Sequence, residues 1–123
     1  MATRLATPDA IPAITDDYLD WLTRELASHA QAYDRSGEFP RAPFDLLARE
    51  GLIGLTVRPE LGGRGANLSE ALRVLAAVAK GEPSTALILF MTYHYHANPH
   101  RAQGWPAAIY ERLAADAVAG RGL

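Results

Sequence analysis

The feature that most constrains the fold is the stretch of residues 51–66, which holds five glycines and one proline in sixteen positions. Glycine and proline are the poorest helix formers, so we do not expect a helix to run through this stretch. We predict a structured loop there, with one extended stretch at Leu55–Val57. On both sides of it, apolar residues recur every three or four positions, and no run alternates strictly between apolar and polar residues. That period is typical of helices with one buried face, so we predict an all-α fold.

Two helices are predicted before the loop. The first starts near Ile14, where Thr15 or Asp16 is suited to cap it, and it ends near Gly37. The second is shorter and ends at Gly51. The N-terminal half of the chain is therefore expected to consist of two helices followed by the glycine-rich loop.

Two further helices are predicted directly after the loop. Asn67 and Glu70 form the pattern of a capping box at the start of the first, which ends at Gly81. Pro83 suits the first turn of the next helix, which runs to about His96. Apolar residues go all the way round this helix, so we expect it to be the central and most buried one.

A last helix is predicted from about Trp105 to Gly120, with Ile109 on its buried face. The whole pattern indicates an orthogonal bundle of about five helices with one glycine-rich connecting loop. Residues 1–13 contain two prolines and no sustained period, so we expect an N-terminal arm there, followed by one helical domain over residues 14–123.

Composition excludes several classes of function. The 12 Lys and Arg are outnumbered by 14 Asp and Glu, whereas nucleic-acid binders carry a basic excess. The absence of cysteine excludes disulfides and thiolate metal sites. The longest apolar run, Ala86–Met91, is far shorter than the roughly 20 residues that span a bilayer, and no secretory signal pattern opens the chain. We therefore expect a cytoplasmic protein that binds neither nucleic acid nor membrane.

The glycine cluster Gly62-Gly63-Arg64-Gly65 precedes a predicted helix, as phosphate-binding loops do. No Lys-Ser/Thr pair follows it, and Leu68 stands where the third glycine of a dinucleotide-binding pattern would be. We therefore interpret the cluster as a structural turn that needs positive φ angles.

The histidines do not form the pattern of a metal site. His94 and His96 are two residues apart on a predicted helix, so their side chains point in different directions, and Pro99 interrupts the helix before His100. No catalytic triad is present either, so we predict neither a metal ligand nor a catalytic residue. His94 beside Tyr93 follows an apolar helix, where a titratable side chain could face a pocket.

Residues 51–65, GLIGLTVRPELGGRG, resemble the N-terminal helical domain of the acyl-CoA dehydrogenase family. In that family, a glycine after a short helix is followed by a hydrophobic stretch and a Pro/Glu-containing turn that closes in Gly-Gly-x-Gly. The predicted helices around the motif agree, so the resemblance covers about residues 14–120. Arg58 stands where the family usually has proline, and Pro59 comes one position later, which alters a turn and not the chemistry.

The resemblance implies an FAD-dependent enzyme that oxidises an acyl-CoA thioester to the 2,3-enoyl-CoA. Family members are longer, and their middle β-domain and C-terminal helical domain supply most of the flavin site and usually the catalytic glutamate. They assemble as homotetramers. We therefore interpret the chain as the N-terminal part of such an enzyme, with the remaining domains as its partners, and expect the chain alone to be inactive.

In the family, the fourth helix of this domain runs past the acyl end of the substrate pocket. The resemblance thus implies a set of side chains that line the substrate or flavin pocket: Leu87, Phe90, Tyr93 and His94. Tyr93-His94, followed by Asn98-Pro99, also resembles a flavin monooxygenase branch of the same superfamily, which would use FMN. Some members of that branch have a histidine one turn earlier, where this chain has Leu89. A non-enzymatic helical interaction module is the third interpretation.

Overall fold

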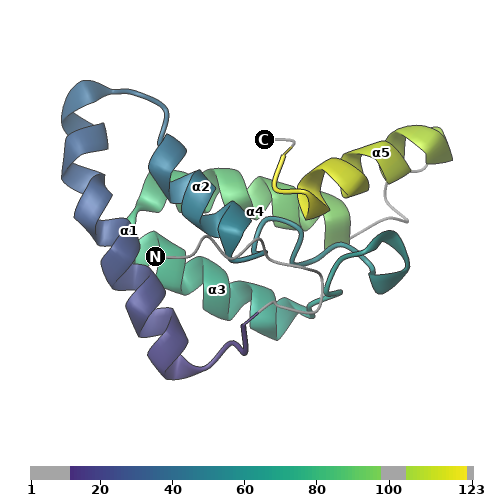
Figure 1. Ribbon diagram of the computed structural model, residues 1–123, viewed down its shortest axis with the longest axis horizontal. Helices are drawn as coiled ribbons and strands as arrows, with labels where there is room; N and C mark the ends of the chain where they lie inside the picture. The colour runs from purple at the N-terminus through teal and green to yellow at the C-terminus, as the bar shows by residue number, and fades with distance from the viewer. Residues whose placement is uncertain (1–11, 98–104, 122–123) are drawn as a thin grey trace.

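The computed structural model describes residues 12–97 and 105–121. Within these ranges the chain is helical without a strand, which confirms the all-α prediction. The elements, labelled as in Figure 1, are α1 (Asp16–Ser36), α2 (Arg41–Arg49), the short 3-10 helix η2 (Pro59–Leu61), α3 (Leu68–Gly81), α4 (Pro83–Ala97) and α5 (Ala107–Val118).

Helix α3 lies at the centre of the packing, with α1 against one side of it and α4 against another (Figure 1). The end of α3 comes very close to α1, because a Cβ atom at Gly81 would lie 2.6 Å from the carbonyl oxygen of Thr23. The Thr23 hydroxyl also donates a hydrogen bond of 2.8 Å to the carbonyl of Ala77. Only glycine at position 81 permits this approach, and the two helices are joined there by both packing and a hydrogen bond.

The predicted helix ends are largely confirmed. The Thr15 side chain accepts a hydrogen bond from the Tyr18 amide, and the Asn67 side chain accepts one from the Glu70 amide. Gly37 ends α1 in the left-handed conformation. The Glu70 carboxylate lies 3.9 Å from the Arg64 guanidinium. The described contacts therefore contain one half of the expected capping box.

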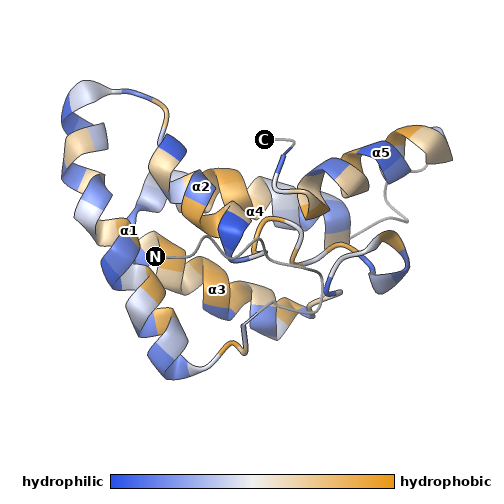
Figure 2. Ribbon diagram, in the orientation of Figure 1, coloured by the Kyte–Doolittle hydropathy of each residue, from blue (hydrophilic) through white to orange (hydrophobic). Residues whose placement is uncertain are grey.

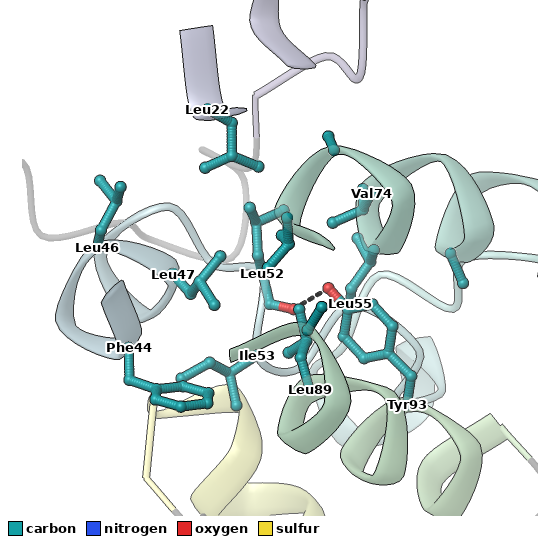
Figure 3. Close-up of a cluster of buried hydrophobic side chains, with 14 of the residues drawn as sticks. Leu22, Phe44, Leu46, Leu47, Leu52, Ile53, Leu55, Val74, Leu89 and Tyr93 are labelled. Carbon is teal, nitrogen blue, oxygen red and sulfur yellow. Dashed lines mark hydrogen bonds between the residues drawn. The ribbon is translucent and has the colours of Figure 1, made fainter. Parts of the chain in front are cut away.

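The first part of the loop between α2 and α3 lies in the core, because residues 52–57 are all buried, whereas residues 58–60 are exposed. Figure 3 shows Leu52, Ile53 and Leu55 among core side chains from α1, α2, α3 and α4. Turns, not an extended strand-like stretch, cover residues 55–57, so the predicted extended stretch is wrong. The bundle is built around this loop, which takes the place that a helix occupies in a simpler bundle.

Two hydrogen bonds to Tyr93 fasten the buried loop to α4. The Tyr93 hydroxyl donates to the carbonyl of Leu52 at 2.5 Å, as Figure 3 shows. The Thr56 hydroxyl donates to the backbone carbonyl of Tyr93 at 3.0 Å. Buried polar groups need such partners, so these bonds satisfy a loop that no β-ladder or helix supports.

Helix α4 is not buried on all sides, and this part of the prediction is wrong. Leu87, Phe90 and Met91 are 67%, 45% and 58% exposed. At 3.6 residues per turn these three side chains share one face of α4, whereas Leu89 and Tyr93 lie on the opposite face against α3 and the loop. A helix that packs on one side only must expose half of its residues, whatever their polarity.

Figure 2 shows that α1 is mostly hydrophilic, whereas hydrophobic residues gather on α2 and α3 toward the centre of the molecule. In α5 the buried residues are Tyr110, Ala114 and Ala117. Ile109 is 46% exposed, so its predicted place on the buried face is wrong. The small alanines allow α5 to lie close to the loop, where Val118 contacts Gly54.

Candidate functional site

An open groove of about 530 Å³ lies between the start of α3, the end of α4 and the segment that carries η2. We call it the α3–α4 groove. Its apolar wall comes mainly from Leu72 and Leu75 of α3 and from Phe90 of α4. Its polar lining residues are Thr56, Arg58, Glu60, Asn67, His94 and His96. A concave, mostly apolar surface with a few polar groups is typical of small-molecule sites.

One residue of the glycine cluster, Gly65, lines this groove. Gly62 and Gly65 have positive φ angles, as the structural interpretation requires. At Gly63 the requirement is space instead, because a Cβ atom would lie 2.2 Å from the carbonyl oxygen of Val57. The amides of Gly62, Gly63 and Gly65 all donate to carbonyls of the preceding turn, at 2.7–3.1 Å. Those amides are used within the loop, which favours a structural turn over a phosphate-binding one.

Three of the four predicted pocket residues line the groove. Phe90, Tyr93 and His94 do so, and the rings of Phe90 and His94 stack with centroids 6.0 Å apart. Leu87 is outside the groove, on the exposed face of α4. The three predicted residues near the end of α4 therefore lie together in the groove, whereas Leu87, nearer the start of α4, lies apart from them.

Tyr93 contributes its ring to the groove rather than its hydroxyl. The hydroxyl is already hydrogen-bonded to Leu52, and the side chain is almost completely buried. Burial raises the pKa of Tyr93 well above its usual value, and a negative charge on Tyr18 would raise it further. Tyr93 therefore stays protonated near neutral pH and does not serve as a base.

His96 was not among the predicted pocket residues, yet it lines the groove and is only 4% exposed. Its Nδ1 atom has no hydrogen-bond partner among the described residues. Burial lowers the pKa of His96 below its usual value, so the imidazole is neutral at pH 7. One sequence feature could have indicated this position: His96 follows the buried Leu89 and Tyr93 by seven and three residues, on the same helical face.

Tyr110 of α5 lies beside both Arg58 and His96. The Arg58 guanidinium carbon lies 5.6 Å from the centre of the Tyr110 ring. The Tyr110 hydroxyl donates to the backbone carbonyl of His96 at 3.3 Å. Through these contacts α5 fixes the positions of one exposed cation and one buried imidazole on the groove lining.

Across residues 12–97 and 105–121, no three His, Asp or Glu side chains come together in a way that could hold a metal ion. In the same ranges, no helix combines the length and the hydropathy that crossing a membrane requires. The Asn98-Pro99 pair and His100, which entered the sequence predictions, lie outside the described residues.

The sequence profile of the family described as "Acyl-CoA dehydrogenase, N-terminal domain" matches residues 9–113. The amino sugar nitrososynthase RubN8 of Streptomyces rubradiris is 40% identical over 84 residues, which are 65% of this chain and 20% of RubN8. The probable acyl-CoA dehydrogenase YngJ of Bacillus subtilis is 34% identical over 68 residues, 55% of this chain and 18% of YngJ. The chain thus spans about a fifth of these relatives.

The fold is also similar to that of KijD3, whose crystal structure was solved in complex with FMN and dTDP-3-amino-2,3,6-trideoxy-4-keto-3-methyl-D-glucose. The TM-score is 0.71 and the sequence identity is 32%, over 94% of this chain and 31% of KijD3. Nearly all of the chain therefore has a counterpart in one part of a much longer protein.

Proposed function

This chain belongs to the acyl-CoA dehydrogenase family, by its match to the N-terminal domain, and from that premise we propose that it forms part of the substrate site of a flavin-dependent enzyme that oxygenates the amino group of a nucleotide-linked sugar. The observation that carries the proposal is the match of 94% of the chain to KijD3, which was solved with FMN and such a sugar. The identity of 40% to the amino sugar nitrososynthase RubN8 supports it independently.

The chemistry of the α3–α4 groove fits a deoxygenated sugar joined to a diphosphate. Leu72, Leu75 and Phe90 offer an apolar wall for ring carbons that carry no hydroxyl. Arg58 is exposed, and its planar guanidinium can donate two parallel hydrogen bonds to a phosphate group. The groove would exclude water from one face of the sugar and hold its amino group in a fixed orientation.

A bound reduced flavin would supply the reducing equivalents and activate molecular oxygen for transfer to the amine nitrogen. The amides of Gly62, Gly63 and Gly65 are hydrogen-bonded within their own turn, so they do not form a binding loop for a flavin phosphate. We therefore assign the groove to the substrate, and the contribution of this chain to catalysis is positioning. A homotetrameric assembly and a cytoplasmic location remain proposals that follow from the family resemblance.

Acyl-CoA dehydrogenation is the second candidate, because YngJ and the family profile favour it. In that case the apolar wall would contact an acyl chain, and FAD would accept the hydride. The family resemblance places the catalytic glutamate of a dehydrogenase outside this chain, so the comparisons are what favour the oxygenase. The identity is 40% to RubN8 and 34% to YngJ, and 94% of the chain matches KijD3.

An exchange of domains between relatives tests the proposal. Residues 12–121 of this chain would replace the matching segment of RubN8 in one chimera and of YngJ in another. We expect the RubN8 chimera to retain measurable oxidation of its amino sugar, with reduced flavin and oxygen supplied, and the YngJ chimera to lose acyl-CoA oxidation. Bound flavin and a cooperative thermal transition show that each chimera is folded.

A matched variant shows whether the groove is responsible for the activity. Phe90→Ala in the RubN8 chimera should raise the KM for the amino sugar several-fold, whereas Ile109→Ala, an exposed apolar residue on α5 outside the groove, should leave it unchanged. A folded RubN8 chimera without activity, beside an active YngJ chimera, would overturn the proposal in favour of the dehydrogenase.

A further inference from the structure

His96 is a buried polar side chain in the lining of the groove with unused hydrogen-bonding capacity. It is 4% exposed, and its Nδ1 atom has no partner among the described residues. The rings of Tyr95 and Tyr110 lie 5.3 Å and 6.1 Å from the imidazole and hold it in place. Buried polar atoms in native proteins are almost always paired, so an unpaired one in a concave site indicates a partner that arrives with a ligand.

The other buried polar side chains of the groove lining, Thr56 and Tyr93, already have hydrogen-bond partners. The Thr56 hydroxyl donates to the Tyr93 carbonyl. The Tyr93 hydroxyl donates to the Leu52 carbonyl. The Asn67 side-chain oxygen accepts from the Glu70 amide at the start of α3. Among the buried groups of the described lining, the imidazole of His96 is therefore the one with a hydrogen-bonding atom left for a ligand.

We infer that His96 Nδ1 forms a hydrogen bond with an uncharged polar group, a hydroxyl or a keto oxygen, on the sugar ring of the ligand. This inference rests on the proposed function and deepens it by naming the contact that distinguishes the sugar from the rest of the nucleotide. Four polar residues of the lining are exposed, Arg58, Glu60, Asn67 and His94, and among them Arg58 is the guanidinium cation. A phosphate would pair with Arg58, and the buried imidazole is left for the sugar.

The protonation state of His96 agrees with an uncharged partner. Burial lowers the pKa of the imidazole, so at pH 7 one ring nitrogen donates and the other accepts. A neutral imidazole has little attraction for a diphosphate but can donate to a keto oxygen or accept from a hydroxyl. Which of the two nitrogens bears the proton would be set by the ligand.

Nitrogen-15 NMR of the imidazole rings tests the inference on the chain itself, because the sequence contains only four histidines. The probes are a dTDP-linked amino-deoxy sugar, dTDP alone and butyryl-CoA, each at millimolar concentration. We expect the dTDP-linked sugar to shift the Nδ1 resonance of His96 and dTDP alone to leave it in place. His29 on α1, remote in sequence and absent from the groove lining, is the internal reference.

Substitutions separate a ligand contact from a structural role. We expect His96→Phe to weaken binding of the dTDP-linked sugar about tenfold, the loss of one hydrogen bond, without lowering the melting temperature. His96→Asn should retain part of the affinity, because its amide can donate or accept. His29→Phe should change neither quantity. A drop in melting temperature without a change in sugar affinity would indicate a structural histidine and overturn the inference.

The outcomes also distinguish this inference from the proposed function. If butyryl-CoA shifts His96 and the dTDP-linked sugar does not, the proposed function fails together with the sugar contact, although His96 remains a ligand-binding residue. If the sugar binds and shifts the groove residue His94 but not His96, the proposed function survives and the inference is overturned. It is overturned as well if no probe moves His96.

Discussion

At the scale of single residues, His96 makes the stability of the fold depend on pH. Burial lowers its pKa in the folded chain below 6.5, and unfolding restores that value. Below about pH 6.5 the unfolded chain therefore binds more protons than the folded chain, so the free energy of unfolding falls as the pH falls through this range. Above about pH 6.5 His96 is neutral in both the folded and the unfolded chain, so it no longer lowers the free energy of unfolding.

The measurement is the urea midpoint at about pH 7.5 and about pH 5.5 in the wild type and in His96→Phe. Protonation of acidic residues also lowers the stability as the pH falls. For each protein, the slope is the change in urea midpoint between the two pH values, and the difference in slope between wild type and His96→Phe reports on His96. We expect a shallower slope in His96→Phe and an unchanged slope in His29→Phe. Identical slopes in all three proteins would contradict the assignment of a buried, neutral imidazole.

The residues of the groove show what the sequence can predict at this scale. Helical spacing, together with the family resemblance, was enough to select Phe90, Tyr93 and His94. It also selected Leu87, which the structure leaves outside the groove. Every face of this helix is apolar at its centre, so the side that meets a groove is decided by how α3 packs against it. His96 is absent from the predicted pocket residues, because the family resemblance points to the pair Tyr93-His94 and not to the residue two positions later.

At the scale of elements, Glu82, the single residue between α3 and α4, stabilises the first turn of α4. Glu82 is buried, and its carboxylate accepts hydrogen bonds from the amides of Ser84 and Thr85 and from the Thr85 hydroxyl. These are the amides that a helix start leaves unsatisfied, and a negative charge there is favoured by the helix dipole. Glu82 is therefore the cap of α4, a role in which Ser, Thr, Asp or Asn is more usual.

We predict that Glu82→Ala lowers the free energy of unfolding by about 1–2 kcal/mol, as the loss of a helix cap does. Glu82→Gln should cost less, because its amide oxygen can still accept the two hydrogen bonds from Thr85. Urea unfolding followed by circular dichroism measures both. Glu111→Ala, an exposed carboxylate on α5, is the control and should change stability little. An equally small effect of Glu82→Ala would show that α4 needs no cap.

Helix positions were the most predictable part of the fold, because each end carries a local signal such as Thr15, Gly37 or Asn67. The path of the glycine-rich segment was not predictable in the same way. Its composition indicates turns, and turns usually lie at the surface. Here Leu52 and Leu55 lie in the core, and the hydrogen bonds that satisfy this buried segment include two with Tyr93, which is far along the chain.

At the scale of the whole molecule, the exposed apolar face of α4 should make the isolated chain associate with itself. Leu87 and Met91 are one turn apart on that face, and both are more than half exposed. Contiguous apolar surface of this kind drives association. We predict that Leu87→Lys combined with Met91→Lys shifts the chain to a monomer in light scattering, whereas Ile109→Lys on α5 does not. A monomeric wild type would contradict this prediction.

The same preparation addresses flavin binding. An affinity in the micromolar range needs roughly 8 kcal/mol, whereas a single hydrogen bond contributes about 1 kcal/mol. The few hydrogen bonds that the polar groups of the groove could form with a flavin do not supply this binding free energy. Titration with FMN or FAD should therefore show no quenching of flavin fluorescence at micromolar concentration, and no turnover of acyl-CoA should follow.

Helix α1 packs mainly against α3 and much less against its neighbour α2, which has a consequence for the nascent chain. The buried stripe of α1, formed by Leu19, Leu22 and Leu26, meets its main partner only when residues 68–81 have left the ribosome. Until then most of this apolar stripe has no partner, and exposed hydrophobic surface of this kind on incomplete chains is the reason chaperones are needed. Synthesis itself therefore sets the earliest moment at which this domain can close, and a pause in translation before residue 81 would prolong the exposure of α1.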